Sequence, residues 1–156
     1  MNQTLVTGAV DACFIVKLGT TKYSPGTPNF GGTIEQVGPT TGWVTSLDSE
    51  TGQIRWQYHA DKPVIAGVTP TAGGVTFTGD LAGNLLVFNS KTGELVNKVQ
   101  TGGALAGGVV TYELGGRQYV AVSSGNVTRN AFGALGVPSV VILALKPAEP
   151  GQSTTQ

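Results

Sequence analysis

Side chains able to act as acids, bases, nucleophiles or metal ligands are few in this sequence, and they stand apart from one another. His59 is the only histidine and Cys13 the only cysteine among the 156 residues. A zinc site or a catalytic triad built on histidine needs further partners at suitable spacing, and His59 has no such pattern around it. We expect His59 to lie at a strand end in solvent, and Cys13, which precedes Phe14 and Ile15, to be a small buried apolar residue.

Short glycine and acidic motifs offer a second kind of chemistry, the binding of phosphates or ions by backbone and carboxylate groups. The pairs Gly102-Gly103 and Gly107-Gly108 do not form a phosphate loop, because no helix is predicted after them and no Lys-Ser/Thr completes the motif. Asp80 follows a predicted strand, and we interpret it as a turn residue rather than a ligand.

Composition excludes several classes of protein. Nine basic and nine acidic residues leave no net charge, so the sequence lacks the clustered positive charge with which proteins bind nucleic acids. Forty per cent of the residues are hydrophobic, which argues against a disordered chain. Because no run of about eighteen apolar residues occurs, no membrane span is predicted, and residues 1–10 do not have the pattern of a signal peptide.

The elements that position these residues are predicted to be strands almost throughout. Short segments rich in Val, Thr, Ile and aromatic residues are bounded by Gly, Pro, Asn or Asp, as strands and tight turns are. No segment keeps an apolar i, i+3, i+4 pattern over three turns, so we expect no substantial helix. The clearest strand segments are 4–10, 43–47, 75–78, 85–88, 109–113, 118–123 and 140–145.

An internal repeat of 41 residues predicts how the strands are grouped. It superimposes Asp48 on Asn89 and Gly52 on Gly93, and both pairs belong to turns whose first side chain can hydrogen-bond its own backbone and whose glycine can take positive φ. Four short strands in about forty residues are typical of a β-propeller blade. We therefore predict an all-β fold, a β-propeller fragment of about two and a half four-stranded antiparallel blades.

The repeat divides the chain into partial and complete blades. Residues 1–147 are expected to form a partial propeller with strands two to four of one blade, all four of the next and strands one to three of a third, and 148–156 a disordered tail. Open blades expose unpaired edges, so we expect the partners to be missing upstream blades, or copies of this chain that associate through those edges. The alternative is an independent β-sandwich of ten strands.

The turn after the first blade's third strand carries a family signature. Residues 46–56 resemble the tryptophan-docking repeat of pyrroloquinoline-quinone (PQQ) dependent alcohol dehydrogenases, Ala-x-Asp-x-x-x-Gly-x-x-x-Trp, with Asp48, Gly52 and Trp56 matching and Ser46 in place of alanine. The next repeat keeps only the glycine: Val87, Asn89, Gly93 and Asn97 occupy its four positions. Longer strings at 71–83, 101–112 and 117–126 are similar to the C-terminal blades of that family's eight-bladed propeller.

The resemblance implies a function and a set of cofactors. Family members oxidise alcohols or polyols in the periplasm with PQQ and a calcium or lanthanide ion, use an aspartate as base, and pass electrons to a cytochrome. Their catalytic aspartate and metal ligands belong to blades upstream of this region, so no catalytic residue and no metal ligand is expected in this chain. The residues expected to contact the cofactor are Asp11, Ala66, Gly67, Gly125 and Asn126.

Two function classes remain open on the sequence. The long predicted loop at 10–41, on the face expected to hold the cofactor, and the string at 117–122 favour part of a dehydrogenase that is inactive alone. Against this, Val10 and Ile65 stand where well-studied family members have an asparagine and a tryptophan. That departure favours a PQQ-like propeller without cofactor, used as a binding or assembly scaffold. Trp43 and Trp56 are expected to pack between blades in either case.

Overall fold

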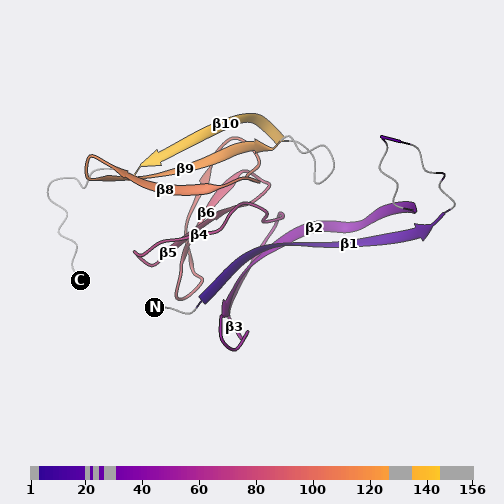
Figure 1. The fold of residues 1–156 in the computed structure, drawn as a ribbon, viewed down its shortest axis with the longest axis horizontal. Coiled ribbons are helices and arrows are strands. Elements are labelled where there is room, and N and C mark those ends of the chain that lie inside the picture. The colour runs from indigo at the N-terminus through magenta and orange to yellow at the C-terminus, as the bar shows by residue number, and fades with distance from the viewer. Residues whose placement is uncertain (1–3, 20–21, 23–24, 27–30, 127–134, 145–156) are drawn as a thin grey trace.

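The strands are arranged as three antiparallel sheets (Figure 1). The computed structural model describes residues 4–19, 22, 25–26, 31–126 and 135–144, and within these ranges it contains ten strands and no helix. This confirms the all-β prediction. The strands are β1 (Thr4–Leu18), β2 (Gly32–Asp48), β3 (Ile54–Ala60), β4 (Thr69–Pro70), β5 (Val75–Gly79), β6 (Asn84–Asn89), β7 (Leu95–Gln100), β8 (Val109–Leu114), β9 (Arg117–Asn126) and β10 (Leu135–Ala144).

Each sheet is a simple meander. The first contains β1–β2–β3, the second β4–β5–β6–β7 and the third β8–β9–β10, in which neighbours along the chain are hydrogen-bonded. The predicted grouping of three, four and three strands is therefore confirmed. The innermost strand of the second sheet is short, because regular pairing covers only Thr69–Pro70. The predicted tail, 148–156, lies outside the described residues.

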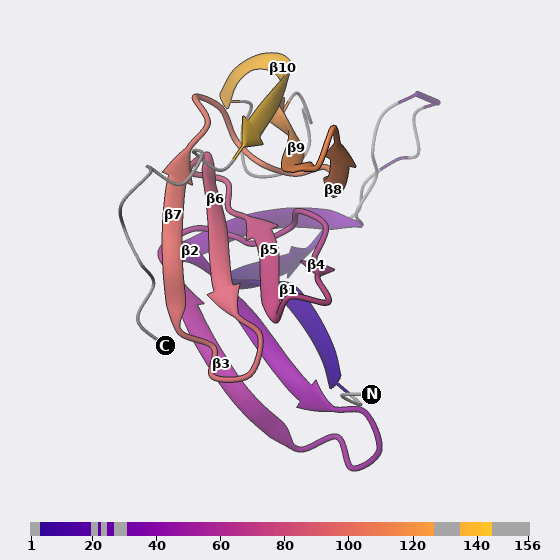
Figure 2. The same ribbon diagram turned by 90° about the vertical axis from the view of Figure 1, so that its left-hand side faces the viewer.

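The sheets stack face to face, as consecutive propeller blades do (Figures 1 and 2). Two separate apolar clusters fill the two interfaces. The cluster between the first and second sheets contains Val44, Trp56, Ala60, Val64, Leu86 and Phe88. The cluster between the second and third sheets contains Ala66, Leu85, Val87, Leu105, Val109 and Val122.

Strand β6 belongs to both interfaces, because its side chains alternate between the two faces of the second sheet. Leu86 and Phe88 pack toward the first sheet, and Leu85 and Val87 toward the third. Burial on both faces accounts for the uninterrupted apolar run that β6 shows in the sequence, where a strand with one wet face would alternate with polar residues.

The segment that links the first sheet to the second, 61–68, bridges the two sheets through its backbone. The Val64 N–H donates to the carbonyl of Ala9 on β1, at 3.3 Å. Next to it, the Pro63 carbonyl accepts from the N–H of Leu81, in the turn after β5, at 3.0 Å. Two neighbouring buried residues, Pro63 and Val64, thus hold two successive sheets together.

The segment that links the second sheet to the third, 101–108, repeats this pattern 41 residues later. The Leu105 N–H donates to the Asp80 carbonyl of the preceding sheet at 3.0 Å. The Ala104 carbonyl accepts from the Gly125 N–H of the following sheet at 2.9 Å. The sequence repeat therefore corresponds to a repeated way of joining sheets.

The predicted loop at 10–41 is wrong for most of its length. Strands β1 and β2 extend into it and pair from Cys13 with Val37 to Leu18 with Gly32, after an irregularity between Asp11 and Cys13. The result is a two-stranded arm that projects away from the sheets, to the right in Figure 1. The run of Cys13, Phe14, Ile15 and Val16, rich in residues that favour strands, supplies the signal that the loop interpretation overlooked.

Both faces of the arm carry exposed apolar residues, because side chains of directly paired residues share a face. Phe14, Val16, Leu18 and Ile34 lie on one face, and the opposite face carries Ile15 and Val37 beside the exposed ion pair of Lys17 with Glu35, at 3.5 Å. Cys13 lies on this arm and is exposed, so the prediction that it is a small buried residue is wrong.

Candidate functional site

The residues expected to contact a cofactor lie in or beside the two linking segments and at the base of the arm. Ala66 and Gly67 belong to 61–68, while Gly125 and Asn126 end strand β9. Asp11 lies on β1, where the arm begins. Gly67 and Gly125 both hydrogen-bond to the segment 101–108, and Asp11 has a separate set of contacts.

Ala66 and Gly67 contact the neighbouring strand and the next linking segment. Ala66 is buried, and its carbonyl accepts from the hydroxyl of Thr78 at 3.5 Å. The Gly67 N–H donates to the carbonyl of Gly107 at 2.8 Å. A Cβ on Gly67 would lie 3.5 Å from the Cα of Gly108, so the two linking segments run in close contact here.

Gly125 is held by both neighbouring chain segments. Its φ of 86° falls in the left-handed region, and a Cβ would collide with the carbonyl of Val137 on β10. Its N–H donates to the carbonyl of Ala104 in the linking segment 101–108. Asn126 pairs through its backbone with Leu135, and its side chain lies outside what the structure describes.

Asp11 belongs to a polar and aromatic cluster on the outer face of the first sheet. Its Oδ2 accepts from the indole N–H of Trp43 at 3.1 Å. The Trp43 ring lies 4.4 Å from the ring of His59 between centroids, and His59 Nε2 is 3.1 Å from the hydroxyl of Thr41. The sequence did not reveal this cluster, because the pairing of Trp43 with His59 depends on strand register.

Trp56, His59 and Asp80 confirm the sequence interpretations, whereas for Trp43 packing between blades stays a prediction. Trp56 is buried between the first two sheets, and His59 is exposed near the end of β3. Asp80 is a buried turn residue whose carboxylate accepts from the backbone and side-chain N–H groups of Asn84, at 2.8 to 3.0 Å. Trp43 lies outside the apolar clusters, half-buried on an outer face.

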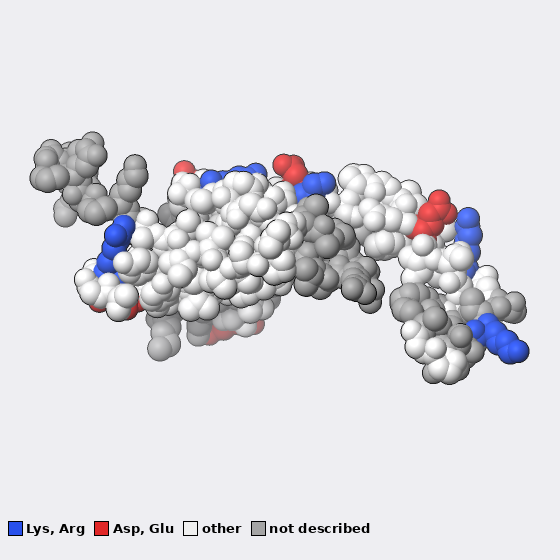
Figure 3. Space-filling view, turned by 90° about the horizontal axis from the view of Figure 1, so that it is seen from above, with Lys and Arg blue, Asp and Glu red and all other residues white. Residues whose placement is uncertain are grey.

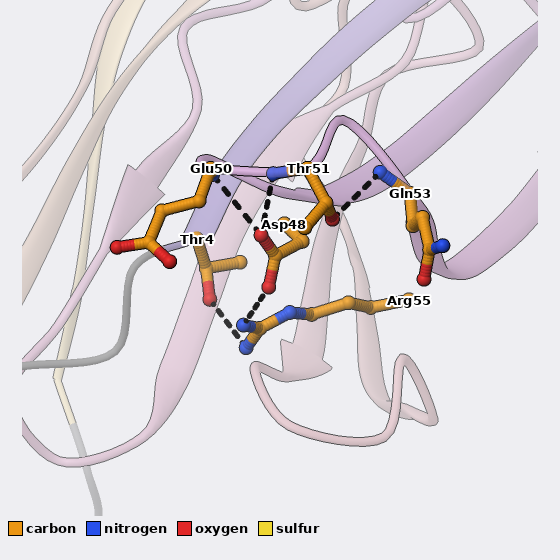
Figure 4. Close-up of polar contacts among 6 residues, drawn as sticks. All are labelled: Thr4, Asp48, Glu50, Thr51, Gln53 and Arg55. Carbon is orange, nitrogen blue, oxygen red and sulfur yellow. Dashed lines mark hydrogen bonds and ion pairs between the residues drawn. The ribbon is translucent and has the colours of Figure 1, made fainter.

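The strongest local electrostatic effect is in the turn between β2 and β3 (Figure 4). Asp48 accepts from the guanidinium of Arg55 at 2.6 Å and from the backbone N–H groups of Glu50 and Thr51 at 3.0 and 2.9 Å. Arg55 first, and then the two N–H groups, hold the pKa of Asp48 well below its usual range. The role of this carboxylate is structural, because all these contacts close the turn.

The described residues do not form a complete site for PQQ. This quinone carries several carboxylates, which require N–H donors or cations. The N–H groups of Gly67 and Gly125 already donate to backbone carbonyls of this chain, so they are not free to bind a carboxylate of the quinone. The carboxylate of Asp11 would repel it. In the part of the chain that the structure describes, no three His, Cys, Asp or Glu side chains come close enough to hold a metal ion.

Comparison with known proteins shows what the repeated sheets belong to. No family model matches the chain. Over 84 residues it is 38% identical to the quinoprotein ethanol dehydrogenase of Pseudomonas putida, which covers 54% of this chain and 14% of the relative. Over 109 residues it is 37% identical to the lanthanide-dependent methanol dehydrogenase of Methylorubrum extorquens, which covers 66% of this chain and 18% of the relative. The chain is a relative of the quinoprotein alcohol dehydrogenases.

The fold agrees with this relationship. The quinohemoprotein alcohol dehydrogenase of Comamonas testosteroni superimposes on 99% of the chain with a TM-score of 0.70 and 21% identity, and 26% of that structure is matched. The three sheets are thus blades of a quinoprotein-type β-propeller. The chain spans less than a fifth of the length of the two curated relatives. In the described residues, no helix is long and apolar enough to cross a membrane.

Proposed function

We propose that this chain forms consecutive C-terminal blades of a periplasmic PQQ-dependent dehydrogenase that oxidises alcohols or polyols. The observation that carries the proposal is the sequence identity of 37–38% to dehydrogenases of this class, over segments of 84 and 109 residues. In that role the chain supplies one wall of the cofactor funnel through its linking segments. Blades outside this chain supply the metal ligands, the catalytic base and the contacts to a cytochrome.

The expected cofactor contacts remain part of the proposal. Ala66, Gly67, Gly125 and Asn126 would shape the wall through backbone and small side chains, and Asp11 would lie at the rim. The quinone, when bound, supplies the oxidising group, which accepts hydride equivalents from the alcohol. The chain's own residues position that wall and keep adjacent blades in register, so we expect no turnover by the 156-residue chain with PQQ and calcium.

A chimera tests the proposal. Residues 4–144 would replace the corresponding segment of the quinoprotein ethanol dehydrogenase of Pseudomonas putida, and dye-linked alcohol oxidation would be measured with PQQ and calcium or a lanthanide. We expect measurable oxidation by the chimera and none by the chain alone. A matched chimera carrying Gly79→Trp, whose side chain would collide with Leu105, should be inactive because adjacent blades no longer pack.

The same experiment distinguishes this proposal from the second candidate, a cofactor-free propeller used as a scaffold. The scaffold is favoured by Val10 and Ile65, which stand where an asparagine and a tryptophan are expected. A chimera that folds, as judged by circular dichroism, but neither binds PQQ nor oxidises alcohols would replace our proposal by the scaffold. If Val10→Asn and Ile65→Trp then restored activity, the loss of PQQ binding would be due to those two positions.

A further inference from the structure

The arm has a free backbone edge along β1. Strand β1 is the edge strand of the first sheet, so β2 is the one strand that pairs with it in the described part of the chain. Close to the sheets this edge is covered, because the carbonyl of Ala9 accepts from the N–H of Val64. Beyond the irregularity between Asp11 and Cys13, the edge continues along the arm over residues 13–18.

The hydrogen-bonding pattern of the arm identifies the backbone groups that face outward. The N–H of Gly19 donates to the carbonyl of Gly31 at 3.0 Å, and these two residues continue the register of the arm. Along an antiparallel pair, residues alternate between hydrogen-bonded and non-hydrogen-bonded positions. Positions 13, 15 and 17 therefore bond to β2, whereas the N–H and carbonyl groups of Phe14, Val16 and Leu18 point away from it.

Residues 13–18 carry few of the features that keep an edge strand from pairing, such as proline, free lysine side chains or bulges. They contain no proline, and their one charged side chain, Lys17, forms an ion pair with Glu35 of the same arm. The free edge of β2 is less regular, because it is interrupted by Gly38, with φ of 78°, and by Pro39, which has no N–H. The edge of β1 is therefore the better template for a further strand.

The side chains of the arm also favour a further strand. Phe14, Val16 and Leu18 are exposed on one face, where Leu18 is 92% exposed, and Ile15 and Val37 are exposed on the other. A hairpin of two strands is marginally stable by itself in water. A third strand would pair with the outward backbone groups and cover part of this apolar surface.

The outward-facing residues are complementary to a second copy of themselves. In an antiparallel pair with a twofold axis through Val16, Phe14 lies opposite Leu18 of the other copy, and Val16 lies opposite its own equivalent. All three then form hydrogen-bonded pairs, and each side-chain pair on that face is apolar. Lys17 lies opposite Ile15 of the other copy, so like charges are not directly opposed. An axis through another residue of the arm would pair fewer of the outward groups.

We propose that two copies of this chain pair through the free edge of β1 on the arm, in a four-stranded antiparallel sheet with the order β2–β1–β1–β2. The contact is isologous, because each copy contributes the same edge. Residues 13–18 include none of the residues expected to contact PQQ, so the proposal goes beyond the proposed dehydrogenase function and does not rest on it. An edge reserved for a strand of another protein, or of blades outside this chain, would stay unpaired in a solution of this chain alone.

Electron paramagnetic resonance on the single cysteine tests the proposal with the 156-residue chain. Cys13 is exposed on the arm, so a nitroxide spin label attached to it reports the distance between the arms of two copies. In the proposed register Cys13 lies opposite Gly19 of the other copy, which places the two Cys13 Cα atoms roughly 20 Å apart at about 3.4 Å per residue. We expect double electron–electron resonance to show a distance that matches this separation. Because the label reports on the arms, copies that also associate through another surface can be measured in the same way.

Two proline variants identify the edge that pairs. Val16→Pro removes an outward N–H from β1 and leaves the hydrogen bonds between β1 and β2 in place, so the fraction of chains that show this distance should fall at least tenfold. The matched control is Ile34→Pro, because Ile34 is the direct partner of Val16 and its N–H points to the free edge of β2. In this control the distance should persist. Hydrogen exchange of the amides at 13, 15 and 17 checks that the arm is intact in each variant.

The proposal is overturned if the labelled wild-type chain shows no distance near that separation up to the highest concentration at which it is soluble. Persistence of the distance in Val16→Pro would overturn it as well. Loss of the distance in Ile34→Pro would have the same meaning, because pairing would not be specific to the edge of β1. If Val16→Pro disrupts the arm, Leu18→Pro, at the outward position nearest the end of β1, takes its place.

Discussion

The indole of Trp56 packs against Gly93 of the following sheet so closely that a Cβ on Gly93 would lie 2.5 Å from its Cδ2 atom. The indole N–H donates to the carbonyl of Ser90, in the same turn, at 3.0 Å. The docking motif thus joins β3, the last strand of the first sheet, to the turn between β6 and β7 of the second. Its glycine serves two purposes: positive φ, at 76°, and room for the ring.

Comparison of two glycine variants separates these purposes. Gly52 is the repeat equivalent of Gly93, with φ of 71°, but a Cβ there would meet nothing within 4 Å. Gly52→Ala should cost only the backbone strain, about 1 kcal/mol. Gly93→Ala should cost about 1–3 kcal/mol more, because the ring must move. Urea unfolding of both variants measures the difference, and equal losses would show that the ring contact adds nothing.

The charge on Asp48 gives the fold a defined response to acid. Its pKa is lowered in the folded state, chiefly by Arg55, while an unfolded aspartate titrates near pH 4. The stabilisation that the charged Asp48 gives the folded state is therefore fully present above about pH 4, and it is lost as the pH falls through the lower folded pKa. The melting temperature of wild type should fall more steeply than that of Asp48→Asn between pH 6 and pH 3.

The neighbouring repeat shows why Asp48→Asn is a clean test. Asn89 occupies the same position, and its Oδ1 accepts from the N–H groups of Lys91 and Thr92 at 3.0 and 3.2 Å. An asparagine at position 48 can therefore keep the turn and lose only the ion pair. Because that pair is exposed, added salt should reduce the difference in melting temperature between wild type and Asp48→Asn at pH 6. If the melting temperatures of the two proteins fall by the same amount between pH 6 and pH 3, the charged Asp48 does not stabilise the fold as proposed.

Local chemistry made the blades predictable from the sequence. The turns at 48–52 and 89–93 are closed by contacts within five residues, and the hydrogen bonds from Gly52 to Asp48 and from Gly93 to Asn89 form as expected. Such turns set the positions of the strands on either side, so the grouping into three sheets followed from the repeat. The resemblance to the dehydrogenases rested on these same turns and on neighbouring strings.

Long-range register limited the prediction of the arm and of the candidate site. Phe14, Ile15 and Val16 favour a strand, but the strand that pairs with them begins at Gly32, across a Gly- and Pro-rich stretch that is typical of a loop. The contact of Asp11 with Trp43 likewise joins residues 32 positions apart. Neither contact leaves a local signature, which is why sequence reasoning missed both.

The hydroxyl of Ser46 is a buried polar group with no hydrogen-bond partner in the part of the chain that the structure describes. The docking motif has alanine at this position, and the next repeat has Val87. Ser46→Ala should stabilise the fold by about 1 kcal/mol, because an unsatisfied buried hydroxyl is removed. Thermal and urea unfolding would measure the gain.

Ser124 is the matched control for Ser46. It is also buried, but its hydroxyl lies 3.1 Å from the Thr101 hydroxyl and donates to the Gly103 carbonyl at 3.1 Å. Ser124→Ala should therefore destabilise by about 1 kcal/mol. The same substitution is expected to have opposite signs at the two sites. A loss of stability at both positions would mean that the Ser46 hydroxyl has a partner, such as a buried water.

The outer face of the third sheet should drive self-association of the isolated chain. Val110 and Ile142 both pair with Ala121 and are 58% and 57% exposed on that face. The view onto β9 and β10 shows a surface with few charges (Figure 3). Buried against another copy, this face would gain hydrophobic stabilisation of the kind that holds the inner sheets together.

A charged pair on that face tests the prediction without changing the net charge. Val110→Lys with Ile142→Glu should shift the chain toward monomer in sedimentation velocity at micromolar concentration and leave its circular dichroism unchanged, since both side chains are exposed. Val141→Lys places a charge on the opposite, buried face of the same strand and should unfold the third sheet instead. If the double variant associates as strongly as wild type, the contact lies on another surface, and the face of the arm that carries Phe14, Val16 and Leu18 is the next to be altered.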